Sequence, residues 1–415
     1  MRVCFTNLGC KLNQAELEGL ARDFTRAGHR VVSSIEAADL HVVNTCTVTH
    51  VAARTSRKAI RRGRRANPKL ATVVTGCWAS EAPAAAQALP GVDLVVTNDR
   101  KDHLLALVHE RFGAPEAELP VPYVPLAFGN TRASVKIEDG CNVGCAFCII
   151  PSTRGRQRSR LLEEVVAEAR SLAEAGFGEI VLTGVQISAY RDPAGRRLVD
   201  LVRAVLRETP VPRLRLTSIA PWDLDERLLS LWDDPRLCRH LHLSLQSGAT
   251  ATLRRMRRPY TAESYGRLLE RVRAAVPGVG ITTDVIAGFP GETEAEFAES
   301  LAFVESARFA KVHAFPFSRR EGTEAAGLPG QIPPEVKKER MARLLAAAEA
   351  GEVAFRQAQL GTLATVLWER PRGEMGHGLT DNYLRVFSEA AAGLWRQLTT
   401  VELVALTEGG VMGRL

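Results

Sequence analysis

Cys141-Asn142-Val143-Gly144-Cys145-Ala146-Phe147-Cys148, eight residues with three cysteines, indicates both the chemistry and the fold expected of this 415-residue chain. Three thiolates from one short loop can each bind one iron of a cubane 4Fe-4S cluster, whereas a cluster held entirely by protein takes four. The alternatives are buried free thiols or a structural zinc site. Zinc needs four ligands, usually as two close pairs, and no cysteine lies between Cys148 and Cys238. The spacing therefore favours an iron-sulfur cluster with one open iron.

An open iron can chelate the amino and carboxylate groups of S-adenosylmethionine. An electron from the cluster then breaks a carbon-sulfur bond and gives a 5′-deoxyadenosyl radical. The loop resembles that of the radical S-adenosylmethionine superfamily, which reads C-x3-C-x-aromatic-C, with Phe147 in the aromatic position.

Length and composition set outer bounds on the class of protein. At 415 residues, 46% hydrophobic and 24% charged, the chain fits two or three globular domains. No apolar run approaches the ~18 residues of a membrane span, and the N-terminus lacks the apolar core of a signal peptide. We therefore expect a cytoplasmic protein without a membrane partner, in which clustered cysteines bind metal rather than form disulfides. Cys4 and Cys238 stand apart from the clusters and are expected in the core.

A second set of three cysteines follows from the pattern of the first hundred residues. Short apolar strands alternate there with amphipathic helices, which predicts a parallel α/β domain over residues 1–115. Cys10, Cys46 and Cys77 each come just past the carboxyl end of an expected strand. Because such ends share one edge of an open sheet, the three thiols are predicted to converge on a second cluster, although any one alone would be read as a buried cysteine. The expected strands are Arg2–Leu8, Leu40–Asn44, Ala71–Thr75 and Leu94–Thr97.

Two further domains are expected. Gly113–Asn130 contains four prolines and no helical period, which indicates a linker. Six β/α units then predict a partial (β/α)6 barrel over residues 127–355, with its chemistry at the carboxyl ends of the strands. A long helix near Pro334–Ala358 leads to an all-β domain over 356–415. The expected barrel strands are Ala133–Glu138, Glu179–Thr183, Arg213–Ser218, His240–Leu245, Gly280–Ile286 and Lys311–Phe315.

Several strand ends of the second domain carry candidate contacts to the cosubstrate. Thr183 and Gly184 would expose backbone groups that a ligand can approach closely, with a tight turn as the alternative. Ser244 and Gln246 offer hydroxyl and amide groups suited to ribose or a carboxylate. Asp284 lies on the fifth strand. No acid-base catalytic residue is assigned, because the cofactors carry the difficult chemistry.

The net charge of +7 is concentrated in one place. Leu40–Ser80 contains no Asp or Glu and eight Lys or Arg, so the rest of the chain nets 7 − 8 = −1. Five of the eight share one face of an expected helix, and a cationic face without acids is the usual footprint of RNA phosphate contact; the alternative is a solvated surface. The five are Arg54, Arg57, Lys58, Arg61 and Arg65. After the 141–148 loop, Arg154, Arg156, Arg158 and Arg160 alternate and either flank a substrate or are surface charge.

The two cysteine triads and the three-part layout resemble the methylthiotransferase family. Within it, Leu8–Glu16, Asn44–Thr49 and Ser56–Arg62 look most like the MtaB type. The first cysteine is followed by Lys11-Leu12, whereas the isopentenyladenosine enzymes usually have Gln-Met there and the ribosomal-protein enzymes Pro-Lys. The resemblance implies two 4Fe-4S clusters, S-adenosylmethionine as methyl and radical donor, and a TRAM-like C-terminal barrel. It also implies a low-potential electron donor and a sulfur source. The implied reaction adds a methylthio group to carbon 2 of N(6)-threonylcarbamoyladenosine at tRNA position 37.

Alternatives remain for the substrate and for the C-terminal domain. The same clusters would serve an enzyme acting on isopentenyladenosine tRNA or on a ribosomal protein, and a non-enzyme reading is an electron carrier or RNA-binding sensor. Residues 356–415 carry six arginines, no lysine and six acids, so bulk attraction to RNA is not expected there. Tyr383 and Arg385 are candidates to stack on or grip a nucleotide; packing of Tyr383 is the alternative.

Overall fold

The computed structural model describes residues 1–114, 130–371 and 373–415. Most of the expected linker, 115–129, lies outside them. The chain divides into two compact units, and the loop between Cys141 and Cys148 contributes to both. The first unit comprises Met1–Asn130, Asp139–Gly144 and Cys148–Gln157; the second comprises Thr131–Glu138, Cys145–Phe147 and Arg158–Leu415. Among the described residues, no helix has the length and apolar character needed to cross a bilayer.

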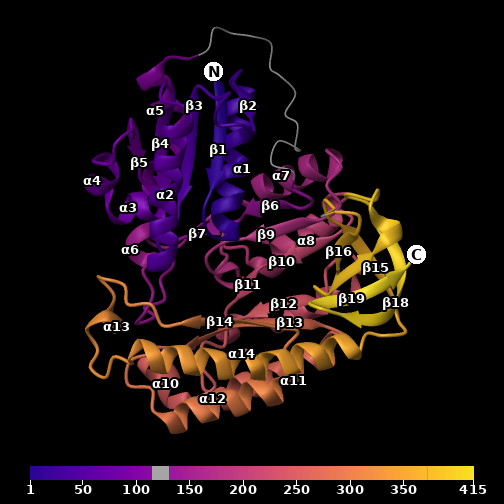
Figure 1. Cartoon of the computed structure of the whole chain (residues 1–415). Helices are drawn as coiled ribbons and strands as arrows, with labels where there is room; N and C mark the ends of the chain where they lie inside the picture. Colours follow the sequence, from indigo (N-terminus) through magenta and orange to yellow (C-terminus); the bar gives the residue numbers. More distant parts are fainter. Residues whose placement is uncertain (115–129, 372) are drawn as a thin grey trace. The chain divides into compact units, whose positions relative to one another are not determined.

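A five-stranded parallel sheet forms the centre of the first unit (Figure 1). Its order is β2-β1-β3-β4-β5. The sequence predicts four of these strands to within a residue or two, but not β2, because three residues are too few to show a period. The strands are β1 (Arg2–Asn7), β2 (Arg30–Val32), β3 (Leu40–Thr45), β4 (Ala71–Gly76) and β5 (Leu94–Val96).

Helices cover both faces of this sheet. Successive residues of a strand point to opposite faces, so Val42 packs with α1 and α5 while Val43 packs with α2, α3 and α4. The 3-10 helix η1 (Asn98–His103) precedes α5, and the short α6 (Ile150–Arg154) also belongs to this unit. The other helices are α1 (Lys11–Arg26), α2 (His50–Ala66), α3 (Cys77–Glu81), α4 (Pro83–Gln87) and α5 (Leu104–Phe112).

The second unit contains a parallel α/β core in two sheets, of order β10-β9-β6 and β11-β12-β13-β14. One expected strand, Arg213–Ser218, is divided at Thr217 into β10 and β11, which pair in different sheets. Helices that include α7 (Leu162–Glu174), α8 (Leu198–Glu208), α11 (Ala262–Ala275) and α12 (Glu294–Ala307) contribute apolar residues to one large core. The strands are β6 (Ala133–Lys136), β9 (Ile180–Thr183), β10 (Leu214–Leu216), β11 (Ser218–Ile219), β12 (His240–Leu243), β13 (Gly280–Ala287) and β14 (Lys311–Pro316).

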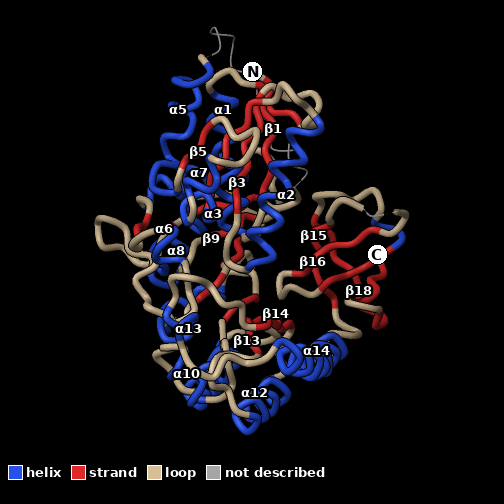
Figure 2. The backbone as a smooth tube through the Cα atoms, turned by 60° about the vertical axis from the view of Figure 1, so that its left-hand side comes forward, coloured by secondary structure: helices blue, strands red, loops and turns tan. Residues whose placement is uncertain are grey.

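The long helix α14 (Pro334–Gln357) packs on β14 and leads to a closed barrel of order β15-β16-β17-β19-β18, whose strands are red in Figure 2. The barrel encloses its own apolar cluster around Trp368. These features confirm the predicted fold class of parallel α/β domains followed by an all-β barrel. The barrel strands are β15 (Leu363–Trp368), β16 (Gly376–Thr380), β17 (Arg385–Ser388), β18 (Leu398–Thr407) and β19 (Gly410–Arg414).

Candidate functional site

The structure places Cys10, Cys46 and Cys77 at one edge of the first sheet. Cys10 precedes α1 directly, Cys46 follows the last residue of β3, and Cys77 opens α3 directly after β4. The strands β1, β3 and β4 are neighbours and parallel, so their carboxyl ends meet. Each thiol lies close enough to interact electrostatically with the other two.

Two glycines allow the three loops to approach one another. Gly9 has φ +114°, and a Cβ at that position would lie 2.8 Å from the Cβ of Cys46. Gly76 has φ +96°, and a Cβ there would collide with the carbonyl oxygen of Thr45. Both backbone conformations also disfavour any residue with a side chain. The glycine before Cys10 and the glycine before Cys77 therefore bring their cysteines next to Cys46.

The three thiols fit a cluster better than a single ion. In the described part of the chain, no three His, Cys, Asp or Glu side chains surround one metal-sized point. A cubane does not require this, because each thiolate binds a different iron and the sulfurs stand further apart. Burial raises the pKa of Cys46 to about 11, so a metal must displace its proton on binding. Cys10 is exposed whereas Cys46 and Cys77 are buried, which leaves the site accessible at Cys10.

Backbone and side-chain N–H groups donate to the sulfurs of the 141–148 loop. The amide of Val143 lies 3.4 Å from the Sγ of Cys141, and the amide of Cys141 donates to the carbonyl of Gly155 at 3.2 Å. In the second unit, Nη1 of Arg258 donates to the Sγ of Cys145 at 3.1 Å. Phe147 packs edge-on against Phe289, with ring centroids 6.3 Å apart. Sulfurs that accept N–H donors are suited to act as thiolate ligands of a cluster.

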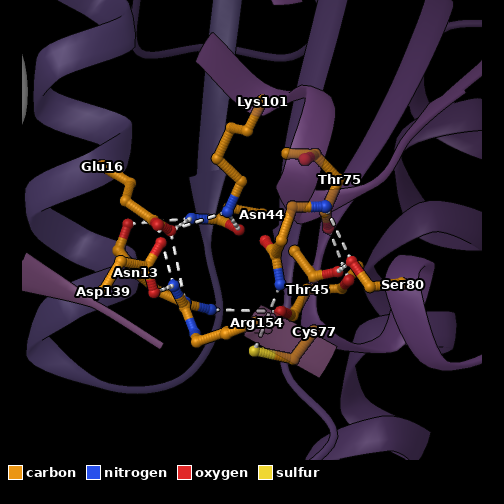
Figure 3. A network of polar contacts seen from close by, with 12 residues as sticks. Asn13, Glu16, Asn44, Thr45, Thr75, Cys77, Ser80, Lys101, Asp139 and Arg154 are labelled. Carbon is orange, nitrogen blue, oxygen red and sulfur yellow. Dashed lines mark hydrogen bonds and ion pairs between the residues drawn. The ribbon is translucent and has the colours of Figure 1, made fainter. Parts of the chain in front are cut away.

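A buried network of charged groups lies beside the first triad (Figure 3). Arg154, on α6, donates to Glu16 at 2.8 Å, to Asp139 at 2.9 Å and to Asn13 at 2.6 Å. Lys101 donates to the other oxygen of Glu16 at 2.7 Å. Burial opposes the charge of Arg154, but Glu16 and Asp139 outweigh it and raise its pKa well above the usual value. Burial lowers the pKa of Lys101, which Glu16 offsets only in part.

This network supports the loops of all three cysteines. Nδ2 of Asn13 donates to the carbonyls of Leu8 and Thr45, at 2.8 and 3.1 Å, just before Cys10 and Cys46. Nδ2 of Asn98 donates to the carbonyl of Thr153 at 2.9 Å and lies 3.9 Å from the Sγ of Cys77. The helix α6, which follows the second triad directly in the chain, thus holds the first triad in place.

The sequence left two roles open for Arg154, substrate contact or surface charge, and the structure supports neither. Its side chain is only 1% exposed. Arg156 and Arg158 are exposed, and Arg160 pairs with Glu168 at 2.5 Å. Nothing in the sequence signals that Arg154 is buried, because its partners Glu16 and Asn13 are far away in the chain.

Arg154→Met should weaken the first cluster site. The change removes the charge that compensates Glu16 and Asp139, and breaking a buried ion pair from one side costs about 3–5 kcal/mol. We expect lower stability to urea and loss of roughly half the iron after anaerobic reconstitution. The control is Arg156→Met, two residues further on and exposed, which should retain both. Full iron content in Arg154→Met would show that the network does not support the site.

The core brings together two of the predicted cosubstrate residues and a histidine that the sequence reading missed. Oγ of Ser244 lies 3.4 Å, and Nε2 of His242 3.2 Å, from Oδ2 of Asp284. Burial alone would raise the pKa of Asp284, but the bond to His242 and the nearby His313 lower it overall. The signal for His242 was available, because His240 and His242 share one face of β12 and Ser244, the residue after the strand, continues the alternation.

The other predicted cosubstrate residues occupy ordered turns. Gln246 is buried with φ +66°, and its backbone N–H donates to the backbone carbonyl of Asp284 at 2.8 Å. Thr183 ends β9 in the other core sheet and is buried. A Cβ on Gly184 would collide with the carboxylate of Glu138. The backbone N–H of Gln186 also donates to this carboxylate, at 2.5 Å. Gly184 is therefore required by close packing against Glu138.

The basic helix α2 presents its cations on the face opposite the sheet. Ala53, Ser56 and Ile60 are buried, and Oγ of Ser56 lies 3.2 Å from the carbonyl oxygen of Cys46 and 3.1 Å from its amide nitrogen. Arg57 is partly buried, with its guanidinium 5.7 Å from the ring centroid of Trp78. The face of α2 that points away from the sheet borders a pocket of about 590 Å³. Its lining residues are the five predicted cations Arg54, Arg57, Lys58, Arg61 and Arg65, together with Arg62.

Tyr383 joins the barrel to the core. Its ring stacks on His240 with centroids 4.4 Å apart, and the guanidinium of Arg215 lies 5.2 Å from its centroid. Arg215 also donates to the carbonyl of Thr380 at 3.1 Å and to Glu179 at 2.6 Å. Tyr383 therefore packs, as one of its two predicted roles requires, and keeps 37% of its surface exposed. Arg385 is exposed at the start of β17.

Two models of known protein families match separate segments of the chain. The radical SAM superfamily model matches residues 135–304, and that of Uncharacterized protein family UPF0004 matches residues 2–97. The chain is 36% identical to threonylcarbamoyladenosine tRNA methylthiotransferase MtaB of Bacillus subtilis, over 97% of this chain and 93% of the relative. It is 37% identical to tRNA-2-methylthio-N(6)-dimethylallyladenosine synthase of Anaeromyxobacter dehalogenans, over 91% and 85%.

The fold is also found in solved structures. The radical S-adenosylmethionine methyltransferase TsrM from Kitasatospora setae matches with a TM-score of 0.57 at 18% identity, over 75% of this chain and 72% of that one. This likeness covers the architecture alone. The two family models and the full-length relatives identify this chain as an enzyme of the radical S-adenosylmethionine methylthiotransferase family that modifies tRNA.

Proposed function

We propose that this enzyme transfers a methylthio group to carbon 2 of N(6)-threonylcarbamoyladenosine at tRNA position 37. The observation that carries the proposal is the pair of cysteine triads, each with one ligand too few for a cubane, in a chain that also carries an acid-free basic helix directly after Cys46. Two open irons suit a reaction that must both make a radical and deliver sulfur to an inert aromatic carbon.

The residues divide these tasks. Cys141, Cys145 and Cys148 would hold the cluster that, when bound, supplies one electron for cleavage of S-adenosylmethionine. Ser244, just past the end of β12, and Asp284, within β13, present oxygen atoms as acceptors for the ribose hydroxyls and the amino group of the cosubstrate. The rings of Phe147 and Phe289 provide an apolar surface beside the 141–148 loop. Thr183, Gly184 and Gln246 shape the neighbouring turns.

The first triad would hold a second 4Fe-4S cluster and keep a sulfur atom ready for transfer. Its accessible side at Cys10 suits the entry of a sulfur source. The reaction also consumes electrons, which a low-potential donor must supply, and two molecules of S-adenosylmethionine, one as methyl donor and one as radical source. A tRNA substrate places this work in the cytoplasm.

The identity of the nucleoside rests on sequence around the first triad. Relatives named for threonylcarbamoyladenosine and for dimethylallyladenosine match at similar identity, 36% and 37%. Lys11-Leu12 after Cys10 favours the first. Mass spectrometry of tRNA nucleosides from cells with and without the gene tests this choice. We expect the 2-methylthio form of threonylcarbamoyladenosine to disappear with the gene; loss of the dimethylallyl product, or of a methylthio group on a ribosomal protein, would contradict it.

The α2 surface should bind tRNA phosphates. Lys58→Gln, Arg61→Gln and Arg65→Gln together remove three exposed charges from one face, at a stability cost within about 0.5 kcal/mol per site. Each lost phosphate contact lowers the slope of log affinity against log salt by nearly one unit. We expect weaker tRNA binding and a flatter salt dependence, measured by filter binding between low and high salt. Arg57 is left unchanged because it also packs on Trp78.

A matched control removes three exposed arginines elsewhere: Arg203→Gln, Arg267→Gln and Arg271→Gln, on α8 and α11. The net charge changes equally in both variants, so a general electrostatic effect would weaken tRNA binding in both. Equal affinities and slopes in the two variants would mean that α2 is a solvated surface, and that the tRNA binds elsewhere.

A further inference from the structure

Arg258 is a cation placed directly against a ligand of the radical-generating site. Nη1 of Arg258 donates to the Sγ of Cys145 at 3.1 Å, a short distance for a bond to sulfur. The residue lies after α10 (Thr250–Arg255) in the second unit, the unit to which Cys145 also belongs. The sequence gives no signal for its role, because Arg258 is one of four arginines within five residues, Arg254 to Arg258.

Two aromatic rings hold the guanidinium in place. Its central carbon lies 4.8 Å from the ring centroid of Trp222 and 5.5 Å from that of Tyr260. Trp222 and Tyr260 are themselves stacked, with centroids 5.7 Å apart. Nε of Arg258 donates to the hydroxyl of Tyr260 at 3.2 Å, and that hydroxyl lies 2.8 Å from the carbonyl oxygen of Ser244. The position of Nη1 is therefore fixed before any ligand binds.

Arg258 is not balanced by an acid. Within residues 1–114, 130–371 and 373–415, no carboxylate forms an ion pair with it; its polar contacts go to Cys145, Tyr260 and the Ser244 carbonyl. The neighbouring Arg255 and Arg257, by contrast, pair with Glu296 and Glu324. A guanidinium is always charged, and Cys145 would supply the opposite charge when it binds iron as a thiolate.

We propose that Arg258 tunes the radical-generating cluster through its bond to Cys145 and makes it easier to reduce. The inference rests on the proposed role of Cys141, Cys145 and Cys148 as ligands. Reduction adds one electron, from a low-potential one-electron donor, and no proton, so the cluster and its thiolates gain one negative charge. A fixed cation and an N–H donor at a ligand sulfur stabilise that added charge, and hydrogen bonds to sulfur are a recognised determinant of cluster potential. Arg258 acts through Cys145 and is a positioning residue.

The test is a potentiometric titration of the reconstituted enzyme without S-adenosylmethionine, followed by electron paramagnetic resonance. The background protein carries Cys10→Ala, Cys46→Ala and Cys77→Ala, so that only the second triad binds a cluster. We expect Arg258→Gln to reduce the equilibrium constant for reduction about tenfold, which is about 59 mV for a one-electron couple. Arg258→Lys keeps the charge and should show a smaller loss.

Arg254→Gln is the matched control, because it removes the same charge from an exposed residue of α10 without touching the bond to Cys145. An unchanged potential in Arg258→Gln, with full iron content, would overturn the proposal. So would an unchanged potential with weaker binding of S-adenosylmethionine, which would assign Arg258 to the cosubstrate. If neither Arg258 variant retains iron, Arg258 serves cluster assembly instead of potential. If the background protein itself shows no cluster signal, the ligand assignment fails, independently of Arg258.

Discussion

Cys141→Ala, Cys145→Ala or Cys148→Ala should each abolish the formation of 5′-deoxyadenosine from S-adenosylmethionine. Each variant leaves only two protein ligands for a cubane that has three where a fully protein-bound cluster has four, so this cluster should be lost. The iron content should then fall from about eight to about four per chain. The measurements are iron analysis after anaerobic reconstitution and chromatography of the cleavage products under a strong reductant. Cys238→Ala is the control, because Cys238 is buried and belongs to neither cysteine triad. Cleavage that persists in all three variants would rule out this loop as the radical site.

Replacing Cys10, Cys46 and Cys77 together by Ala should separate the two halves of the reaction. The iron content should again fall by about half, but reductive cleavage of S-adenosylmethionine should remain measurable, because the second triad keeps its own three ligands. Methylthiolated tRNA should be undetectable. Cys4→Ala is the matched control, since Cys4 lies on β1 within the same unit and is buried. Product formed by the triple variant would make the first triad a structural element without a part in sulfur transfer.

The sequence was sufficient for the fold class because strands and helices alternate with clear periods. Its errors came where periodicity carries no information. The three-residue β2 is too short to show alternation, and the division of one expected strand into β10 and β11 at Thr217 depends on pairing with different neighbours. Convergence of Cys10, Cys46 and Cys77 could be predicted because it follows from the geometry of any parallel sheet.

The groups that support the cysteines could not be predicted in the same way. Arg154 meets Glu16 and Asn13 across more than a hundred residues of chain, and Arg258 meets Cys145 in a similar manner. Neither pair has a spacing that a local pattern detects. The basic face of α2 was visible because its members are local, yet the contact of Arg57 with Trp78 depends on the turn from β4 into α3.

The contacts of α6 with the first sheet have consequences for the synthesis of the protein and for the design of truncated fragments. During synthesis, Glu16, Asn44 and Lys101 emerge from the ribosome well before Arg154, the residue that completes their network. A truncated chain that stops at residue 114 would contain the whole five-stranded sheet and all three cysteines, but it would bury Lys101 and Glu16 without the guanidinium that lies between Glu16 and Asp139. An N-terminal piece intended for study on its own should therefore be extended through Gln157, the last residue of the first compact unit.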